Sequence, residues 1–278
     1  MLIQHPLVRR WRYLFLALLV AIALCLSQPV TARAIPWADI IFRGIQVLQL
    51  STLSDQQEVA LGQQINQQLI TSQIRILRNS GLTQYINRMG QQLAANSARP
   101  QMPYTFQVVN DRRVNAFATM GGFVYVNAGL IATADNEAEL ASVLAHEIGH
   151  IADRDAVNQM KETAIASGLV SAAGLNRNTA VAIGVDLALR RPNSRQDELQ
   201  ADEFGLAMMR QTGYAQSAAV TFMTKLLNQD VVPAFLSTHP ATSYRIRRMQ
   251  QIIDSSGQAN QGGGLDKAAY RAKINSFR

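Results

Sequence analysis

Apolar residues recur at helical spacing in two stretches of the first half of the chain. Across residues 41–72 they lie three or four positions apart opposite a Gln-rich side, which predicts an amphipathic helical region. Within it, at the turn Leu53-Ser54-Asp55, we expect Asp55 and not Ser54 to act as the N-cap. A second helical stretch covers residues 81–98 and ends before two prolines.

The pattern changes to short β-rich runs between Tyr104 and Ile131. These runs cover residues 106–109, 116–119 and 123–126. Polar residues 110–113 separate the first two runs, and Gly121-Gly122 separates the last two. The pattern predicts a small sheet that ends in a hairpin.

Helices are predicted for most of the remaining chain. Asn136, with Glu139 three residues later, forms a capping box that opens a helix reaching Ile151. Residues 160–190 are small and apolar, but breaks divide them into two pieces, each too short to span a bilayer. They predict a helical hairpin that lies over the functional site or against a membrane surface. Residues 256–278 are interpreted as a Gly-rich linker and a flexible, solvated tail.

Residues 1–34 have the organisation of an export signal. Arginines precede an apolar run from Tyr13 to Leu26, and Ala32-Arg33-Ala34 has the small residues of a cleavage site. A retained anchor is the alternative, because the flanks can extend the run towards the ~20 residues of a spanning helix. We expect an exported protein that is periplasmic or lumenal, with one domain over residues 35–255. If the anchor is retained, we expect the protein to be membrane-associated.

Cleavage of this signal changes the charge and removes reactive side chains. It takes away four of 26 basic residues and none of 19 acids, so the net charge falls from +7 to 22 − 19 = +3. We therefore expect no nucleic-acid partner. Cys25, the only cysteine, is also lost, which excludes thiolate catalysis and thiolate metal ligation. The histidines that remain are His146, His150 and His239.

The run HEIGH, residues 146–150, has the spacing of a metal site on a helix. Because residues four apart share a helix face, His146 and His150 aim at one point. Glu147 then reaches the water that a metal at this point activates, and it takes the proton of that water. Such a match arises by chance on the order of once in several hundred chains. Gly149 costs roughly 1 kcal/mol relative to Ala in a helix, which indicates that another backbone approaches closely.

A catalytic zinc site needs a third protein ligand and one open position. Without cysteine the natural third ligand is a carboxylate, and the best candidate is Glu198 in Ser194-Arg-Gln-Asp-Glu-Leu-Gln-Ala-Asp202. Glu198 and Asp202 share a face, so Glu198 can ligate while Asp202 accepts a hydrogen bond from a ligand histidine. Small residues beside them would let this helix pack on Gly149. From spacing alone, a solvated acidic face is an equally good interpretation.

HEIGH followed by Ser-Arg-x-x-Glu-x-x-Ala-Asp resembles the gluzincin metallopeptidase family of HtpX, BepA and the CAAX prenyl endopeptidases, especially its soluble periplasmic members. The resemblance spans about residues 53–250 and includes Asn115-Ala116-Phe117, Gly121-Gly122, Val124-Tyr125-Val126-Asn127, Thr238-His239-Pro240 and Arg245. It implies a zincin-like α+β domain, mostly helical, with a small sheet beside the HExxH helix and one zinc ion per chain.

The resemblance also implies roles for single residues. The implied zinc ligands are His146, His150 and Glu198. The implied catalytic base is Glu147. Asp202 matches an acid that assists the site. His239 matches a histidine near the metal, where it either stabilises the developing oxyanion or occupies the open position and silences the enzyme. Arg245 is expected to be a structural ion-pair partner.

The predicted hairpin has a mechanistic use in this interpretation. Proteases that cut extended chains hold the substrate as an added strand on a sheet edge. We expect the hairpin to supply that edge, and the expected substrate-binding residues are Phe117, Gly121, Gly122 and Val124. A purely structural hairpin is the alternative. Unlike the HtpX-like members, the chain has no apolar spans flanking the motif, and unlike the BepA-type members it has no repeats after residue 255.

The sequence therefore predicts a zinc-dependent endopeptidase that cleaves extended, misfolded or unassembled envelope and membrane-associated proteins. Its partners are protein and peptide substrates, and nothing indicates an oligomeric state. The first alternative is a proteolytically silent, chaperone-like or binding protein of the same fold, with the zinc site blocked by His239 or by residues 160–190. The second is a zinc hydrolase of another substrate class, for which the sequence offers no pocket motif.

Overall fold

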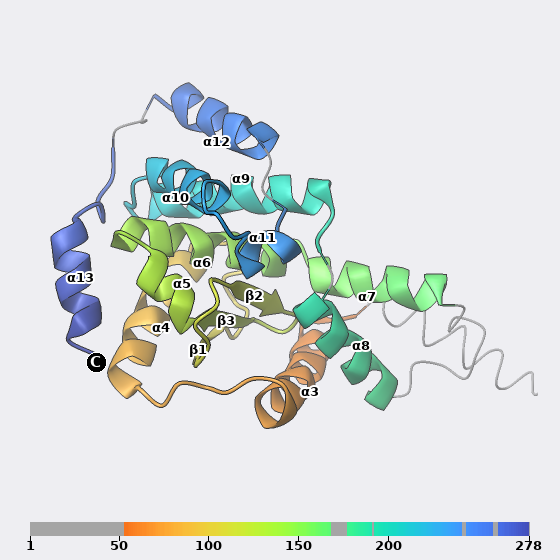
Figure 1. Cartoon of the computed structure of the whole chain (residues 1–278). Coiled ribbons are helices and arrows are strands. Elements are labelled where there is room, and N and C mark those ends of the chain that lie inside the picture. The colour runs from red at the N-terminus through yellow and green to blue at the C-terminus, as the bar shows by residue number, and fades with distance from the viewer. Residues whose placement is uncertain (1–52, 168–176, 191, 241–242, 258–260, 278) are drawn as a thin grey trace, which may run out of the picture. The chain divides into compact units, whose positions relative to one another are not determined.

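The computed structural model describes residues 53–167, 177–190, 192–240, 243–257 and 261–277 (Figure 1). All of these residues belong to one compact unit. The predicted export signal and the first part of the predicted helical region 41–72 lie outside the described residues.

A three-stranded sheet forms where the sequence predicts it. Strands β1 (Thr105–Val109), β2 (Ala116–Thr119) and β3 (Phe123–Asn127) lie in the order β1-β3-β2, with β1 parallel and β2 antiparallel to β3. Every residue of the central strand β3 is buried. The hairpin between β2 and β3 turns at Gly121 and Gly122, whose φ angles of 80° and 93° favour glycine.

Helices α6 (Glu137–Ala152) and α9 (Arg195–Gln211) run side by side next to the sheet (Figure 1). They approach very closely, since a Cβ atom added at Gly149 would lie 2.9 Å from the carbonyl oxygen of Ala201. Gly205 on α9 faces the backbone nitrogen of His146 in the same way, at 3.2 Å. The predicted reason for a glycine within the HEIGH helix is thus confirmed.

The first turn of α3 (Asp55–Ser72) corrects the predicted cap. Ser54, and not Asp55, is the N-cap: its hydroxyl accepts from the Gln57 N–H, and the Gln57 side chain accepts from the Ser54 N–H. A side-chain oxygen at the residue before the helix reaches the free N–H groups of the first turn, which Asp55 inside the helix cannot do.

The start of α6 follows the prediction in part. Asn136 accepts a hydrogen bond from the Glu139 N–H, as expected of the cap. The Glu139 carboxylate does not return to Asn136, because it accepts from the Asp135 N–H at 2.8 Å and pairs with Lys225. The box is therefore replaced by a single cap bond and a buried ion pair.

Further helices pack around the sheet and the α6–α9 pair. They are α4 (Ser80–Ala94), α5 (Ala128–Thr133), α7 (Asp155–Ala166), α8 (Arg177–Arg190), α10 (Ser217–Leu227), α11 (Ala234–Thr238), α12 (Ser243–Ser255) and α13 (Lys267–Asn275). One apolar core joins α4, α6, α10 and one face of the sheet, and a second lies between the other face, α3, α7 and α8. The mostly helical α+β class is confirmed.

Residues 160–190 contribute to two helices, α7 and α8, on either side of residues 168–176, which lie outside the description. α8 packs against α3, α7 and the edge strand β2. Within the described ranges, no helix combines the length and the hydropathy of a membrane span.

The C-terminal segment departs from the predicted flexible tail. Residues 267–275 form α13, capped by Asp266, and Tyr270 is buried against the larger core. The Tyr270 hydroxyl donates to the Ile131 carbonyl at 2.7 Å. Tyr270, Ile274 and the following Phe277 pack against the larger core and fix this helix, and the basic, polar composition of the segment conceals these contacts.

Candidate metal centre

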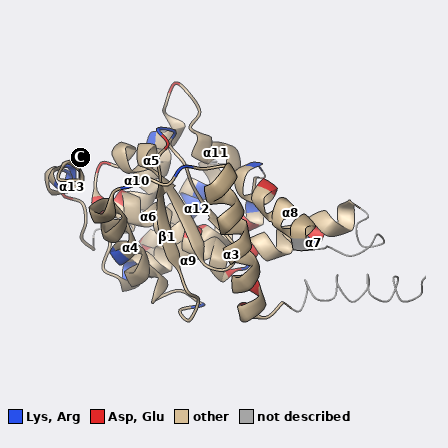
Figure 2. Cartoon of the chain, turned by 90° about the horizontal axis from the view of Figure 1, so that it is seen from below, with Lys and Arg blue, Asp and Glu red and all other residues tan. Residues whose placement is uncertain are grey.

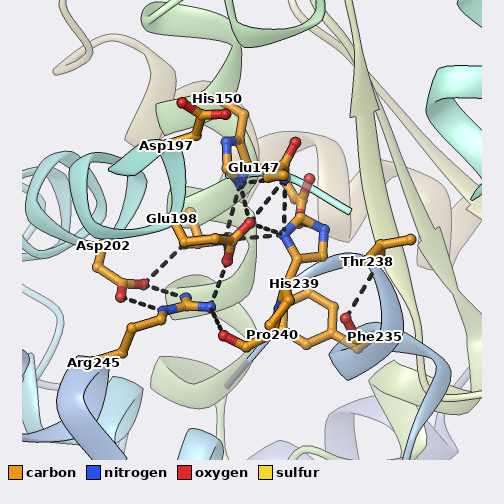
Figure 3. Close-up of polar contacts among 12 residues, drawn as sticks. Glu147, His150, Asp197, Glu198, Asp202, Phe235, Thr238, His239, Pro240 and Arg245 are labelled. Carbon is orange, nitrogen blue, oxygen red and sulfur yellow. Dashed lines mark hydrogen bonds and ion pairs between the residues drawn. The ribbon is translucent and has the colours of Figure 1, made fainter. Parts of the chain in front are cut away.

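Helix α6 carries the HEIGH run, and its Glu147 and His150 side chains lie beside Glu198 and His239 (Figure 3). Both histidines of the run are buried, and their Nε2 atoms lie 3.1 Å apart. Glu147 between them is fully buried, and neither carboxylate oxygen has a hydrogen-bond partner among the described residues. The motif thus places two imidazole nitrogens beside a carboxylate that has no structural hydrogen bond.

Glu198, in the first turn of α9, reaches the histidine pair. Its two carboxylate oxygens each lie 3.4 Å from an Nε2 atom, one from His146 and the other from His150. Ser194 caps α9 one turn earlier. The close α6–α9 contact therefore brings the predicted third ligand to the other two.

His239, which follows α11, is the fourth member of the cluster. Its Nδ1 lies 3.2 Å from His146 Nε2 and 3.0 Å from Glu198 Oε1. Its Nε2 lies 3.4 Å from Glu147 Oε1. The imidazole stacks on Phe235 with ring centroids 4.6 Å apart. His239 thus faces both the other donors and the predicted base.

A buried carboxylate stands behind each histidine of the motif. Asp202 Oδ1 lies 3.0 Å from His146 Nδ1, and Asp155 Oδ2 lies 2.6 Å from His150 Nδ1. A carboxylate at Nδ1 retains the ring proton there, so the lone pair on Nε2 faces the cluster. Asp202 was predicted near the site, whereas sequence reasoning missed Asp155.

The position of Asp155 depends on an unusual turn. Arg154, the residue before α7, has a φ of 63°, a backbone conformation that residues other than glycine rarely adopt. Its guanidinium lies 3.3 Å from Glu58. Helical spacing from His150 does not reveal this contact, because the chain changes direction between the two helices.

Arg245 of α12 holds the acids of α9. It donates two hydrogen bonds to Asp202, at 2.8 and 2.7 Å, and another to Glu198. Burial alone would raise the pKa of Asp202, but the hydrogen bonds from Arg245 and His146 lower it. The expected structural ion pair is confirmed, and Asp202 is an anion.

The donor set fits a metal ion. Nitrogens of His146, His150 and His239 and an oxygen of Glu198 all lie within 4.8 Å of one another. The contacts among these side chains, some to one Glu198 oxygen and some to the other, are 3.0–3.4 Å, close to the spacing of about 3.3–3.4 Å between neighbouring ligands held at about 2.0–2.1 Å from zinc. A catalytic site normally keeps one position open, and here His239 stands at that position.

In the metal-free cluster, protons take part in the charge balance. Burial lowers the pKa of His150, but hydrogen bonds to Asp155 and Glu198 outweigh burial and raise this pKa to about 10. For Glu198, the effect of burial is outweighed by His239 and the two motif histidines, so its pKa is lowered. A metal ion must therefore displace a proton from His150.

Of the predicted substrate-binding residues, the structure brings only Phe117 to the site. Phe117 lines a cavity of ≈ 50 Å³ beside Glu147 and His150. Gly121 and Gly122 pack against the backbones of α3 and of residues 103–104, and Val124 is fully buried in β3. The cavity wall also includes Leu187 and Ala188, so α8 covers this side of the site.

Asn193 is a further residue that sequence reasoning missed. It lines both this cavity and a second one of ≈ 470 Å³ between α9 and α12. Its amide nitrogen lies 2.9 Å from Glu198 Oε1 and 3.2 Å from His150 Nε2. It precedes the cap of α9, where no spacing rule marks it as functional.

The fold and the buried histidine-glutamate cluster define a protein of the zincin-like metallopeptidase class. Residues 80–253 match the sequence profile of Peptidase family M48, and the chain belongs to this family.

Relatives with assigned names agree with this membership. The chain is 32% identical to the beta-barrel assembly-enhancing protease of Escherichia coli strain K12 over 82% of this chain and 51% of that protein. It is 30% identical to the putative beta-barrel assembly-enhancing protease of Vibrio cholerae over 91% of this chain and 56% of that protein. It is also 30% identical to the mitochondrial metalloendopeptidase OMA1 of Schizosaccharomyces pombe, over 62% of this chain and 53% of that protein. The chain thus spans about half the length of these relatives.

The state of His150 predicts that metal affinity rises with pH. Because its raised pKa of about 10 keeps the metal-free ring protonated, each metal ion bound releases this proton. We expect the apparent affinity to increase roughly tenfold per pH unit between about pH 6.5 and 9, measured by chelator competition on EDTA-stripped protein.

Asp155→Asn is the matched control for this titration. It keeps a hydrogen-bond acceptor at His150 but removes the negative charge that raises the pKa of His150. The increase in apparent metal affinity per pH unit should therefore become smaller. An affinity that does not change with pH in the native protein would contradict the prediction.

Proposed function

We propose that this protein is a zinc-dependent endopeptidase, and the observation that carries the proposal is the buried Glu147 carboxylate without a hydrogen-bond partner beside the four-donor cluster. A zinc ion held by His146, His150 and Glu198 would activate a water molecule and polarise the scissile carbonyl. A buried carboxylate without a hydrogen bond is costly to maintain, so its retention in the fold supports a chemical role.

Each residue around the cluster has its own role in the proposed reaction. Glu147 removes a proton from the attacking water and delivers it to the leaving amine. Asp155 and Asp202 fix the rings of the two motif histidines. His239 stands at the fourth corner, so water and the scissile carbonyl enter only when this ring turns away from Glu198.

The edge of β2 supports a binding mode for extended substrates. Asn127 N–H donates to Asn115 O, and in an antiparallel pair such bonds alternate along the strand. Residues 117 and 119 therefore bond to β3, while the N–H and C=O of Ala118 point to the open edge. Ala118 lines the cavity beside Glu147, so a chain added at this edge would pass the predicted base.

The names of the relatives support a location and a class of substrate. Beta-barrel assembly-enhancing proteases, by their name, enhance the assembly of β-barrels. With the export signal expected for residues 1–34, this favours an envelope protease that cleaves extended, misfolded or unassembled proteins. Contact with a membrane surface belongs to the same proposal.

A second candidate is a silent, chaperone-like or binding protein of the same fold. Two observations favour it. His239 completes the tetrahedron of donors, and α8 lies against the edge strand that an extended substrate would use. In this state both the metal and the edge are covered, so proteolysis requires movement of His239 and of α8.

Removal of Glu198 tests the ligand set. We expect Glu198→Ala to reduce zinc from one ion per chain to a minor fraction, because the remaining donors His146, His150 and His239 lose the anionic ligand of the set. Glu203→Ala, an exposed acid of the same helix, should retain full zinc. The measurement is elemental analysis after dialysis. Full zinc content in Glu198→Ala would remove Glu198 from the ligand set.

Cleavage of casein separates the two candidate functions. Glu147→Gln should retain zinc and lose on the order of 10³-fold or more in rate, because the base is absent. His239→Ala should cleave faster than the native protein, because it opens the fourth corner. No cleavage by the native protein or by His239→Ala would favour the binding protein.

A proline on the edge strand tests the binding mode. Ala118→Pro removes an N–H that points away from β3, so the sheet should form while an added strand loses a hydrogen bond. We expect casein cleavage to fall about tenfold or more with zinc content unchanged. Ala118→Ser, which keeps the N–H, is the control. Equal rates for the two variants would exclude this edge.

A further inference from the structure

The geometry points to a further group in the reaction: we propose that the side-chain amide of Asn193 donates a hydrogen bond to the oxygen that gains negative charge on the scissile carbonyl. The inference rests on the proposed peptidase function. It adds a neutral donor beside a cluster whose candidate metal ligands are three histidines and one carboxylate.

A hydrogen bond on the side away from the cluster fixes the orientation of the Asn193 amide. Gln159 of α7 donates from Nε2 to Asn193 Oδ1 at 2.6 Å, so the amide nitrogen of Asn193 points towards the cluster. The reverse orientation would place an amide oxygen 2.9 Å from the Glu198 carboxylate, where two acceptors repel each other. The backbone N–H of Asn193 donates to Thr238 O at 3.1 Å, which also fixes the main chain.

The nitrogen lies at the corner that the reaction needs. Asn193 Nδ2 lies 3.4 Å from His239 Nδ1, and the other nitrogen of that ring lies 3.4 Å from Glu147 Oε1. When His239 turns away, an oxygen that enters the same corner meets the amide of Asn193 as well as the carboxylate of Glu147. One residue supplies a donor and the other a base.

The amide also has a hydrogen to spare. It carries two N–H bonds, and Glu198 Oε1 accepts one of them. The remaining contacts are to imidazole nitrogens of His150 and His239. A ligating imidazole nitrogen has no free lone pair, so the second N–H is available for substrate. Because Asn193 lines both cavities, a chain that passes from one to the other passes this donor.

Asn193→Ala tests the donor. Loss of one oxyanion donor typically lowers kcat by about 10²–10³-fold, so we expect this loss with zinc content unchanged and KM within a few-fold. A phosphonate peptide, which mimics the tetrahedral intermediate, should lose affinity by the same factor as kcat/KM. A cleavage-product peptide should bind the zinc-loaded variant as tightly as it binds the native protein.

Gln159→Glu provides a second, isosteric test. A glutamate only accepts, so it would turn the Asn193 amide and draw its N–H groups away from the cluster. Gln159 is a positioning residue in this proposal. Its variant should show the same selective loss of phosphonate affinity, and the double variant Gln159→Glu, Asn193→Ala should be no slower than Asn193→Ala alone.

The outcomes separate this inference from the proposed function. If the native protein cleaves casein and Glu147→Gln does not, an unchanged kcat in Asn193→Ala overturns only the donor. A loss of zinc, or an equal loss of affinity for phosphonate and product, would show a structural role and overturns it as well. If neither the native protein nor His239→Ala cleaves, the peptidase function fails and the donor fails with it.

Discussion

The close contact between α6 and α9 is the constraint on which the site depends. Gly149 and Ala201 let the two backbones meet, and this sets the distance from the motif histidines to Glu198. A larger residue at 149 would separate the helices by a distance comparable with the tolerance of a metal site, which is a few tenths of an ångström. The packing distance between the two helices therefore also determines the distances between the candidate metal ligands.

The parts of the site that follow helical periodicity were predictable. His146, Glu147 and His150 share one helix, and Glu198 and Asp202 share another, so spacing and a family resemblance placed all five. Asp155 and Asn193 were missed because they lie where the chain enters a helix: Asp155 is the first residue of α7, and Asn193 precedes the cap of α9. Their positions depend on one left-handed residue, Arg154, and on contacts to distant segments, which a local pattern does not encode.

The fold shows the same division between local and distant information. The sheet, the hairpin and the helix pairs agree with the hydrophobic pattern, because burial of alternate or helically spaced side chains dictates them. The cap at Ser54 and the packed helix α13 do not follow from that pattern. The cap depends on one hydroxyl at a helix start, and α13 depends on Tyr270, Ile274 and Phe277, which pack on distant parts of the chain.

The ion pairs of Arg245 set an order in which the site can form during synthesis. The two histidines emerge with α6, but the carboxylate partner arrives with α9, and its buried cation arrives only with α12. Until then Asp202 lacks the cation whose hydrogen bonds lower its pKa and favour its burial as an anion. A nascent chain therefore carries an incomplete histidine-carboxylate cluster until nearly the whole domain has been translated.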